Sequence, residues 1–91
     1  ANILAVDGRK VIVPLSEHVL AGVTVQAVLK LLSGWGYTIE ERRLAMEDWC
    51  GLPNIFLTNA LIGAVKVLTI DEKNIKHETD LCSQINSELF R

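Results

Sequence analysis

The sequence has 91 residues, of which 49% are hydrophobic, and its 9 basic and 11 acidic residues give a formal net charge of -2. This length allows one domain near the lower limit for a self-sufficient core, and the apolar share is high for so small a body. The basic residues are scattered, and no apolar run approaches the roughly 20 residues that cross a bilayer, so neither nucleic acid nor membrane is an expected partner. We expect some of the apolar surface to contact further protein.

The cysteines and histidines do not form a metal-binding pattern. Cys50 and Cys82 fit neither a C-x-x-C pair nor a zinc cluster, which predicts reduced thiols in a cytoplasmic protein. His18 and His77 each lack a second histidine at metal-ligand spacing, so no metal site is predicted. The opening Ala1-Asn2-Ile3 has neither an initiator methionine nor a secretory signal, and we expect the sequence to start inside a longer protein.

The first predicted elements are a hairpin and a helix. Residues 3–6 and 9–13 are strand-like and flank Asp7-Gly8, a dipeptide typical of a type I′ turn. Pro14 should end the second strand, because it has no N–H for the ladder. After an irregular segment, apolar residues from position 25 to 32 follow helical spacing, and the run Ser33-Gly34-Trp35-Gly36 should stop that helix.

The second half returns to strands and ends in a helix. Residues 37–44 look extended, 46–51 suggest a short helical turn, and 55–58 have the character of a buried strand. Residues 65–70 and 74–75 flank a polar tripeptide and suggest another hairpin. Leu81, Ile85 and Leu89 predict a terminal helix that lies on the sheet, capped by Thr79 or Asp80. The predicted fold is one mixed α/β (α+β) unit in the order ββαβ(α)ββα.

Two polar segments are candidates for an anion site. Gly22, Val23 and Thr24 stand at the start of the first helix, where free N–H groups and the macrodipole favour an anion; the alternative is an ordinary helix start. Thr58-Asn59-Ala60 follows a buried strand and could donate to the same anion if both ends lie together; the alternative is turn chemistry.

Other familiar motifs are absent from the sequence. There is no P-loop and no dinucleotide glycine pattern, so ATP and NAD are not indicated. Ser16, Glu17 and His18 are adjacent, but no G-x-S-x-G accompanies them, and a hydrolase triad is rejected.

The order of segments resembles that of a known enzyme family over nearly the whole chain, from Asn2 to about Ile75. The matching segments are Asn2-Ile3, Pro14-Leu15-Ser16-Glu17, Leu20-Ala21-Gly22-Val23-Thr24, Ile39-Glu40-Glu41-Arg42 and Phe56-Leu57-Thr58-Asn59-Ala60-Leu61. The chain resembles fold-type IV pyridoxal-phosphate enzymes, the class IV aminotransferase family, and is most similar to the C-terminal part of aminodeoxychorismate lyases. Aminotransferases usually carry Gly-Thr where this chain has Asn59-Ala60. In addition, this chain has Lys66 at a position where relatives often have proline.

The resemblance implies a cofactor and a set of residues that bind it. Pyridoxal 5′-phosphate would be held through its phosphate by Gly22, Val23 and Thr24, with a second contact from Asn59 and Ala60. The Schiff-base lysine and the glutamate at the pyridine nitrogen would both lie upstream, so this chain would hold no catalytic residue and would be inactive alone. Its lysines match no catalytic position; they are Lys10, Lys30, Lys66, Lys73 and Lys76.

The implied activity of the parent protein is 4-amino-4-deoxychorismate lyase, which forms 4-aminobenzoate and pyruvate on the way to folate. An alternative in the same family is a branched-chain or D-amino-acid aminotransferase. A third possibility is a non-enzymatic interaction module. The resemblance further implies as partners a small-molecule substrate, the upstream half of the same enzyme and a second copy in a homodimer.

Overall fold

The computed structural model describes residues 2–15 and 22–91, with elements in the order ββαβαββββα. The helices are α1 (Val23–Gly34), α2 (Met46–Trp49) and α3 (Leu81–Leu89). The strands are β1 (Asn2–Asp7), β2 (Lys10–Pro14), β3 (Thr38–Arg42), β4 (Ile55–Asn59), β5 (Gly63–Lys66), β6 (Thr69–Ile70) and β7 (Lys73–Asn74). The predicted mixed α/β class is confirmed.

The main sheet has five strands in the order β3-β2-β1-β4-β5, and β6 and β7 form a separate two-stranded sheet. Strand β1 pairs antiparallel with both β2 and β4, whereas β2 pairs parallel with β3 across the connection that contains α1. Because β2 and β4 both run opposite to β1, they point the same way. Their carboxyl ends, Pro14 and Asn59, therefore lie at one edge of the sheet.

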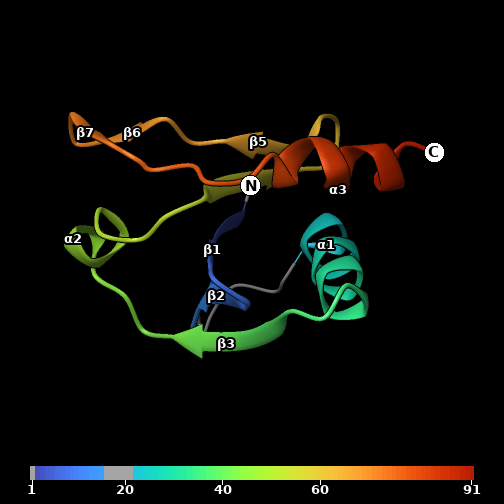
Figure 1. Cartoon of the computed structure of the whole chain (residues 1–91), viewed down its shortest axis with the longest axis horizontal. Coiled ribbons are helices and arrows are strands. Elements are labelled where there is room, and N and C mark those ends of the chain that lie inside the picture. Colours follow the sequence, from blue (N-terminus) through green and yellow to red (C-terminus); the bar gives the residue numbers. More distant parts are fainter. Residues whose placement is uncertain (1, 16–21) are drawn as a thin grey trace.

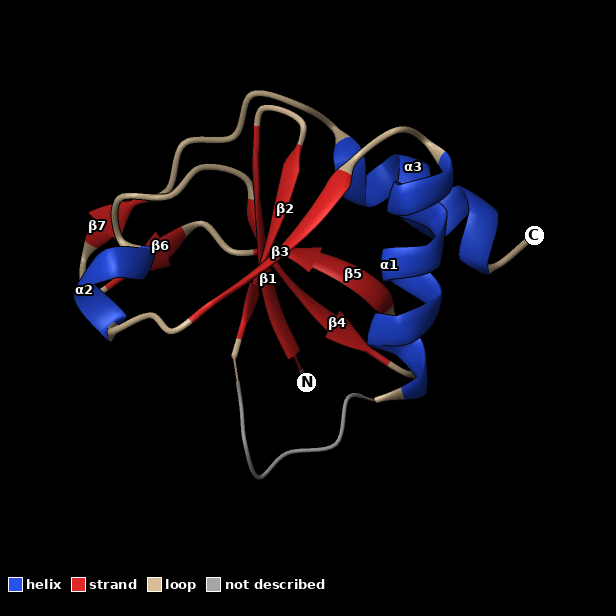
Figure 2. Cartoon of the chain, turned by 90° about the horizontal axis from the view of Figure 1, so that it is seen from below, coloured by secondary structure: helices blue, strands red, loops and turns tan. Residues whose placement is uncertain are grey.

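The two faces of the sheet are covered differently (Figures 1 and 2). Helices α1 and α3 cover one face, where Leu4, Val11 and Phe56 pack against Val28 and Ile85. Helix α2 and the β6–β7 hairpin lie on the other face. There, Trp49 of α2 and Ile75, just after β7, form a second buried cluster with the sheet residues Ala5, Ile12 and Ile55. Alternate residues of one strand thus serve two cores, as the period of two in a β-strand requires.

Helix α1 ends as the glycine run predicts. Gly36 has φ +95°, its N–H donates to Ser33 O at 3.1 Å, and the Tyr37 N–H donates to Leu32 O at 3.0 Å. This pair of bonds is the Schellman arrangement, in which a left-handed glycine lets the chain turn out of the helix. The chain then enters β3, which is shorter than the predicted strand over residues 37–44.

Several local predictions need correction. The first turn is Gly8-Arg9, not Asp7-Gly8, because Asp7 pairs with Lys10. Of the turn residues Gly8 and Arg9, only Gly8 has a positive φ. A positive φ at the first central position alone is typical of a type II′ turn, whereas type I′ requires it at both positions. Two successive positive φ angles occur instead at Asp71 (φ 48°) and Glu72 (φ 66°), between β6 and β7.

The later strand and the cap of α3 also differ from expectation. Residues 65–70 do not form one strand, because pairing with β4 ends at Lys66 and β6 pairs with β7. Asp80 stands at the N-cap of α3, but its side chain makes no capping bond. The structure does not describe residues 16–21, which include the adjacent Ser16, Glu17 and His18 and the family-like Leu20 and Ala21.

Both cysteines are free in the structure. Burial raises the pKa of the Cys82 thiol, an effect that nearby Lys66 opposes and Asp80 reinforces. Cys82 therefore stays protonated well above neutral pH, which disfavours a nucleophilic role.

Asn54 connects three segments just before β4. It is 6% exposed, its Nδ2 donates to Val6 O at 2.9 Å, and its Oδ1 accepts from the Glu78 N–H at 2.8 Å. Its own N–H donates to Lys76 O, also at 2.8 Å, and its φ is +50°. One side chain thus joins β1 to the segment that leads into α3.

We predict that Asn54→Ala lowers the free energy of unfolding by about 2–4 kcal/mol. The Val6 carbonyl and the Glu78 N–H lose their hydrogen-bond partner, and alanine tolerates the positive φ less well than asparagine does. Asn54→Gly should be about 1 kcal/mol less damaging, since glycine accepts the left-handed backbone. Urea denaturation of both variants separates the loss of the hydrogen bonds, which both share, from the backbone strain, which only alanine adds. Equal stability of the two variants would contradict the backbone contribution.

Candidate functional site

The first turn of α1 presents unpaired backbone donors. Gly22 is extended (φ -65°, ψ 157°), and its carbonyl accepts the first helical hydrogen bond, from the Gln26 N–H at 3.1 Å. The N–H groups of Val23, Thr24 and Val25 come before that bond and so have no partner within the helix. Among the described residues, no side chain caps this end and no acidic residue stands in the first turn. The helix start is therefore suited to an external anion.

The carboxyl end of β4 adds side-chain donors at the same edge. Asn59 Oδ1 accepts from the Leu61 N–H at 2.8 Å, which closes the turn after the strand and leaves the amide nitrogen of Asn59 as a donor. Thr58 is 2% exposed, and its hydroxyl donates to Asn2 O at 3.5 Å. The turn chemistry considered for this segment is present, and it fixes the direction of the amide.

One cavity of about 550 Å³ brings the two segments together. Its lining residues come from the N-terminus of β1, the start of α1 and the end of β4; they are Asn2, Gly22, Val23, Thr24, Thr58, Asn59, Ala60 and Leu61. The five residues singled out from the sequence all belong to this set. None of these described lining residues carries a carboxylate, so none of them repels an anion. The donors and the charge balance fit a phosphate group.

Three lining residues were not among those assigned to the cofactor, although one of them, Thr58, belonged to the candidate segment Thr58-Asn59-Ala60. Asn2 and Thr58 reach the cavity because they are paired across β1 and β4, and Leu61 follows in the turn. A strand register is not visible in a single sequence, so the pairing of Asn2 with Thr58 could not be predicted. The hydroxyl of Thr58, next to the predicted Asn59, was the available signal.

The described part of the chain contains neither a cluster of potential metal ligands nor a helix long and apolar enough to span a membrane. No lysine lines the cavity. The pocket can bind and orient an anionic group, but its described lining residues offer no amine or general base.

The topology brings the start of α1 and the carboxyl end of β4 to one cavity, and the comparisons with known proteins identify the family. Residues 1–70 match the family described as amino-transferase class IV. The chain belongs to the class IV aminotransferase family, an enzyme family.

The curated relatives are much longer than this chain. Branched-chain-amino-acid aminotransferase 1, mitochondrial, of Arabidopsis thaliana is 30% identical over 100% of this chain and 24% of its own length. The chain spans about a quarter of the length of the curated relatives it matches.

Solved structures share the fold across almost the whole chain. An aminotransferase from Brucella abortus bound to the cofactor PLP has a TM-score of 0.82 and 27% identity, over 98% of this chain and 32% of its own. The 4-amino-4-deoxychorismate lyase of Pseudomonas aeruginosa has a TM-score of 0.82 and 25% identity, over 97% of this chain and 33% of its own. Transaminases and a lyase thus share this arrangement of strands and helices.

Proposed function

We propose that this chain holds the phosphate of pyridoxal 5′-phosphate in the cavity between α1 and β4, through Gly22, Val23, Thr24, Asn59 and Ala60. The observation that carries the proposal is the convergence of the helix start and the strand end on one cavity, where no described lining residue carries a carboxylate. When bound, the cofactor supplies an electron sink for bond cleavage at the substrate.

The contribution of these residues is binding and orientation. A phosphate dianion in front of α1 accepts hydrogen bonds from backbone N–H groups and interacts favourably with the positive end of the helix dipole. The Thr24 hydroxyl and the Asn59 amide are further donors at the same cavity. Donors from two elements restrict the rotation of the phosphate, which fixes the direction in which the rest of the cofactor extends.

The parent protein in this proposal contains more than these residues: the chain forms the C-terminal part of a PLP-binding large domain, completed by an upstream half and paired in a homodimer. Two cavity-lining side chains support a covering partner, since Val23 is 86% and Leu61 is 87% exposed. Large aliphatic side chains at the mouth of a site are favourably buried when protein or ligand covers them.

The proposed reaction is the conversion of 4-amino-4-deoxychorismate to 4-aminobenzoate and pyruvate. The segment Asn59-Ala60-Leu61 supports this reaction, because it resembles the segment that aminodeoxychorismate lyases carry at the same strand end. The likeness to the Pseudomonas aeruginosa lyase at 25% identity supports it as well.

A second candidate is a branched-chain amino-acid aminotransferase. The names of the curated relatives favour it, including Arabidopsis thaliana and Staphylococcus aureus proteins at 30% identity. The phosphate anchor would serve either reaction, so the two candidates differ in substrate rather than in the cavity described.

The deciding experiment assays the enzyme that contains this chain with each substrate class. We expect release of 4-aminobenzoate and pyruvate from 4-amino-4-deoxychorismate without any added keto acid. Activity that instead requires a branched-chain amino acid together with a keto acid would replace the lyase by the aminotransferase. Absence of pyridoxal 5′-phosphate binding would contradict both and favour an interaction module.

A further inference from the structure

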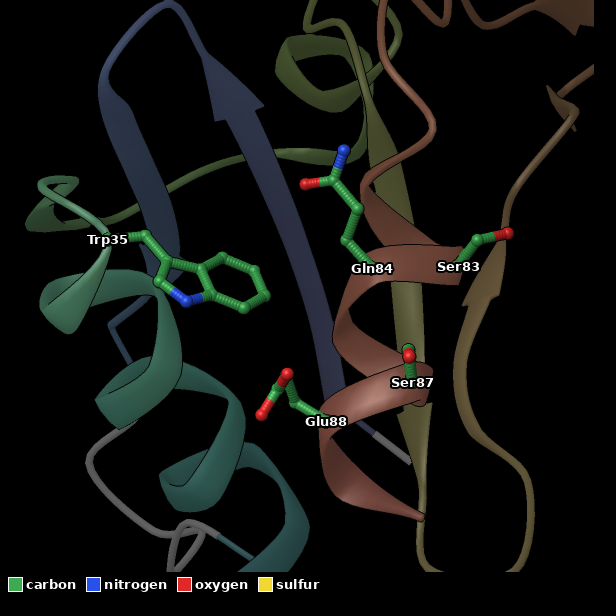
Figure 3. Close-up of a pocket in the computed structure, with 5 residues that line it drawn as sticks. All are labelled: Trp35, Ser83, Gln84, Ser87 and Glu88. Atoms are coloured by element: carbon green, nitrogen blue, oxygen red, sulfur yellow. The ribbon is translucent and has the colours of Figure 1, made fainter. Parts of the chain in front are cut away.

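A second hollow lies between α1 and α3 and shares no lining residue with the phosphate cavity. It consists of two adjoining spaces of about 550 and 420 Å³, both lined by Trp35 and Glu88. Figure 3 shows the Trp35 indole directed from the end of α1 toward α3, with the Glu88 carboxylate directed back toward the indole. We call these joined spaces the α1–α3 groove.

The larger space of the groove is mostly aliphatic. Ala27 and Leu31 of α1 and Leu89 of α3 line it together with the Trp35 ring. Lys30 lies in the same lining, one residue before Leu31 on α1. An apolar side chain of a ligand could thus lie beside a cationic group of the protein.

The smaller space is bounded by polar side chains on its α3 side, and one of them, Glu88, carries a negative charge. Glu88 and Gln84 lie one turn apart on α3, and two serines complete that side. A carboxylate beside an indole favours an ammonium ion, through charge-assisted hydrogen bonds and through the ring face. Glu88 already pairs with Arg91 at 3.3 Å, but the Arg91 side chain is 80% exposed, and an exposed pair of this kind contributes little.

The size of the groove is compatible with a small molecule. Its two spaces of about 550 and 420 Å³ fall in the range of roughly 300–1,000 Å³ typical of ligand sites. A ligand that matches the groove has an ammonium group, a carboxylate and an aliphatic chain.

We infer that the α1–α3 groove binds a free amino acid with an aliphatic side chain. The ammonium group contacts Glu88 beside the Trp35 indole, the carboxylate pairs with Lys30, and the side chain covers Leu31 and Leu89. Since no residue of this groove lines the phosphate cavity, the inference does not depend on the proposed cofactor. The groove is a second, non-catalytic site at which an amino acid would stabilise the packing of α1 against α3.

The test is a titration of the full chain with L-leucine, followed by the indole N–H signals in nuclear magnetic resonance spectra. Trp35 is 36% exposed and lines the groove, while Trp49 is 5% exposed on the opposite face of the sheet and serves as an internal control. We expect the Trp35 signal to shift with a dissociation constant of about 1 mM, as suits a ligand of this size, and the Trp49 signal to stay in place.

Charge variants separate the groove from unspecific binding. Glu88→Gln should raise the dissociation constant about fivefold, whereas the matched control Glu47→Gln on α2 should leave it unchanged. Arg91→Gln should lower the dissociation constant, because it removes the cation that competes for Glu88. Lys30→Met should weaken the binding of leucine but not that of isopentylamine, which has no carboxylate.

Three results would overturn the inference: no shift of the Trp35 signal at about 20 mM leucine, more than ten times the expected constant; equal constants for Glu88→Gln and Glu47→Gln; or binding of isovalerate as tight as that of leucine. Retained cofactor binding alongside any of them would show that this inference fails while the proposed function stands.

Discussion

Replacing Gly63 with alanine is expected to lower the free energy of unfolding by about 2–5 kcal/mol, because backbone strain and overpacking act together at this position. Gly63 begins β5 with φ +78°, a conformation that residues with a Cβ rarely adopt. A Cβ built there would also overlap Asn86 Oδ1 and would lie 2.8 Å from Phe90 Cε2. For a small domain with a total stability of about 5–15 kcal/mol, this is a large fraction.

The crowding at Gly63 has a structural purpose. Asn86 Oδ1 accepts from the Ala64 N–H at 2.8 Å, and Asn86 Nδ2 donates to Ala64 O at 2.9 Å. The side chain of α3 thus satisfies the outer backbone groups of edge strand β5 as a neighbouring strand would, and it protects that edge from pairing with another chain. Only a residue without a Cβ at position 63 lets α3 approach closely enough.

Urea denaturation of Gly63→Ala measures this effect, and Gly34→Ala is the matched control. Gly34 is the last residue of α1, and a Cβ there would meet nothing within 4 Å, so alanine should leave stability unchanged or raise it by about 0.5–1 kcal/mol. In the Asn86→Ala background, part of the cost of Gly63→Ala should disappear, because the overlapping amide is gone. Full additivity of the two substitutions would argue that φ and the contact with Phe90, rather than the overlap with Asn86, are responsible.

The elements that followed from the sequence are those whose signal is local. Helix α1 has apolar residues at helical spacing and a glycine stop, and both recur in the structure as buried Val25, Val28 and Leu32 and as left-handed Gly36. The position of the first turn was missed by one residue, because a glycine suits either the second central position of a type I′ turn or the first of a type II′ turn, and the pairing of Asp7 with Lys10 decides between them. Register is a property of two strands and cannot be read from either alone.

The candidate site was predictable in its parts but not in its assembly. The glycine and hydroxyl residues at the start of α1 and the amide at the end of β4 each suggested an anion contact, and each also had an ordinary structural explanation. What joins them is the position of β1 between β2 and β4, which directs both carboxyl ends to one edge. The role of Asn54 in linking distant segments had no sequence signal, since its partners Val6 and Glu78 lie 48 and 24 residues away.

Gly22→Asp is expected to weaken the binding of pyridoxal 5′-phosphate by at least about tenfold in the enzyme that contains this chain. A carboxylate at the N-cap of α1 would compete for the N–H groups of the first turn and repel a phosphate dianion; two like charges about 4 Å apart interact by roughly 4 kcal/mol near a protein surface. The backbone tolerates the change, because Gly22 has φ -65° and, among the described residues, a Cβ there would meet only Asn2 Oδ1, at 3.4 Å.

The same substitution should stabilise the fold while it harms binding, and this opposition of signs makes the prediction specific. Aspartate is a favourable N-cap residue and interacts well with the helix dipole, so the free energy of unfolding of Gly22→Asp should rise by up to about 1 kcal/mol. Gly22→Asn is the neutral, isosteric control: it caps the helix as well but should bind the cofactor more tightly than Gly22→Asp. Pyridoxal, which lacks the phosphate, should bind Gly22→Asp and the unaltered enzyme equally. If Gly22→Asp weakened pyridoxal and pyridoxal 5′-phosphate alike, the loss would arise elsewhere in the site, and the start of α1 would be an ordinary helix terminus rather than the phosphate anchor.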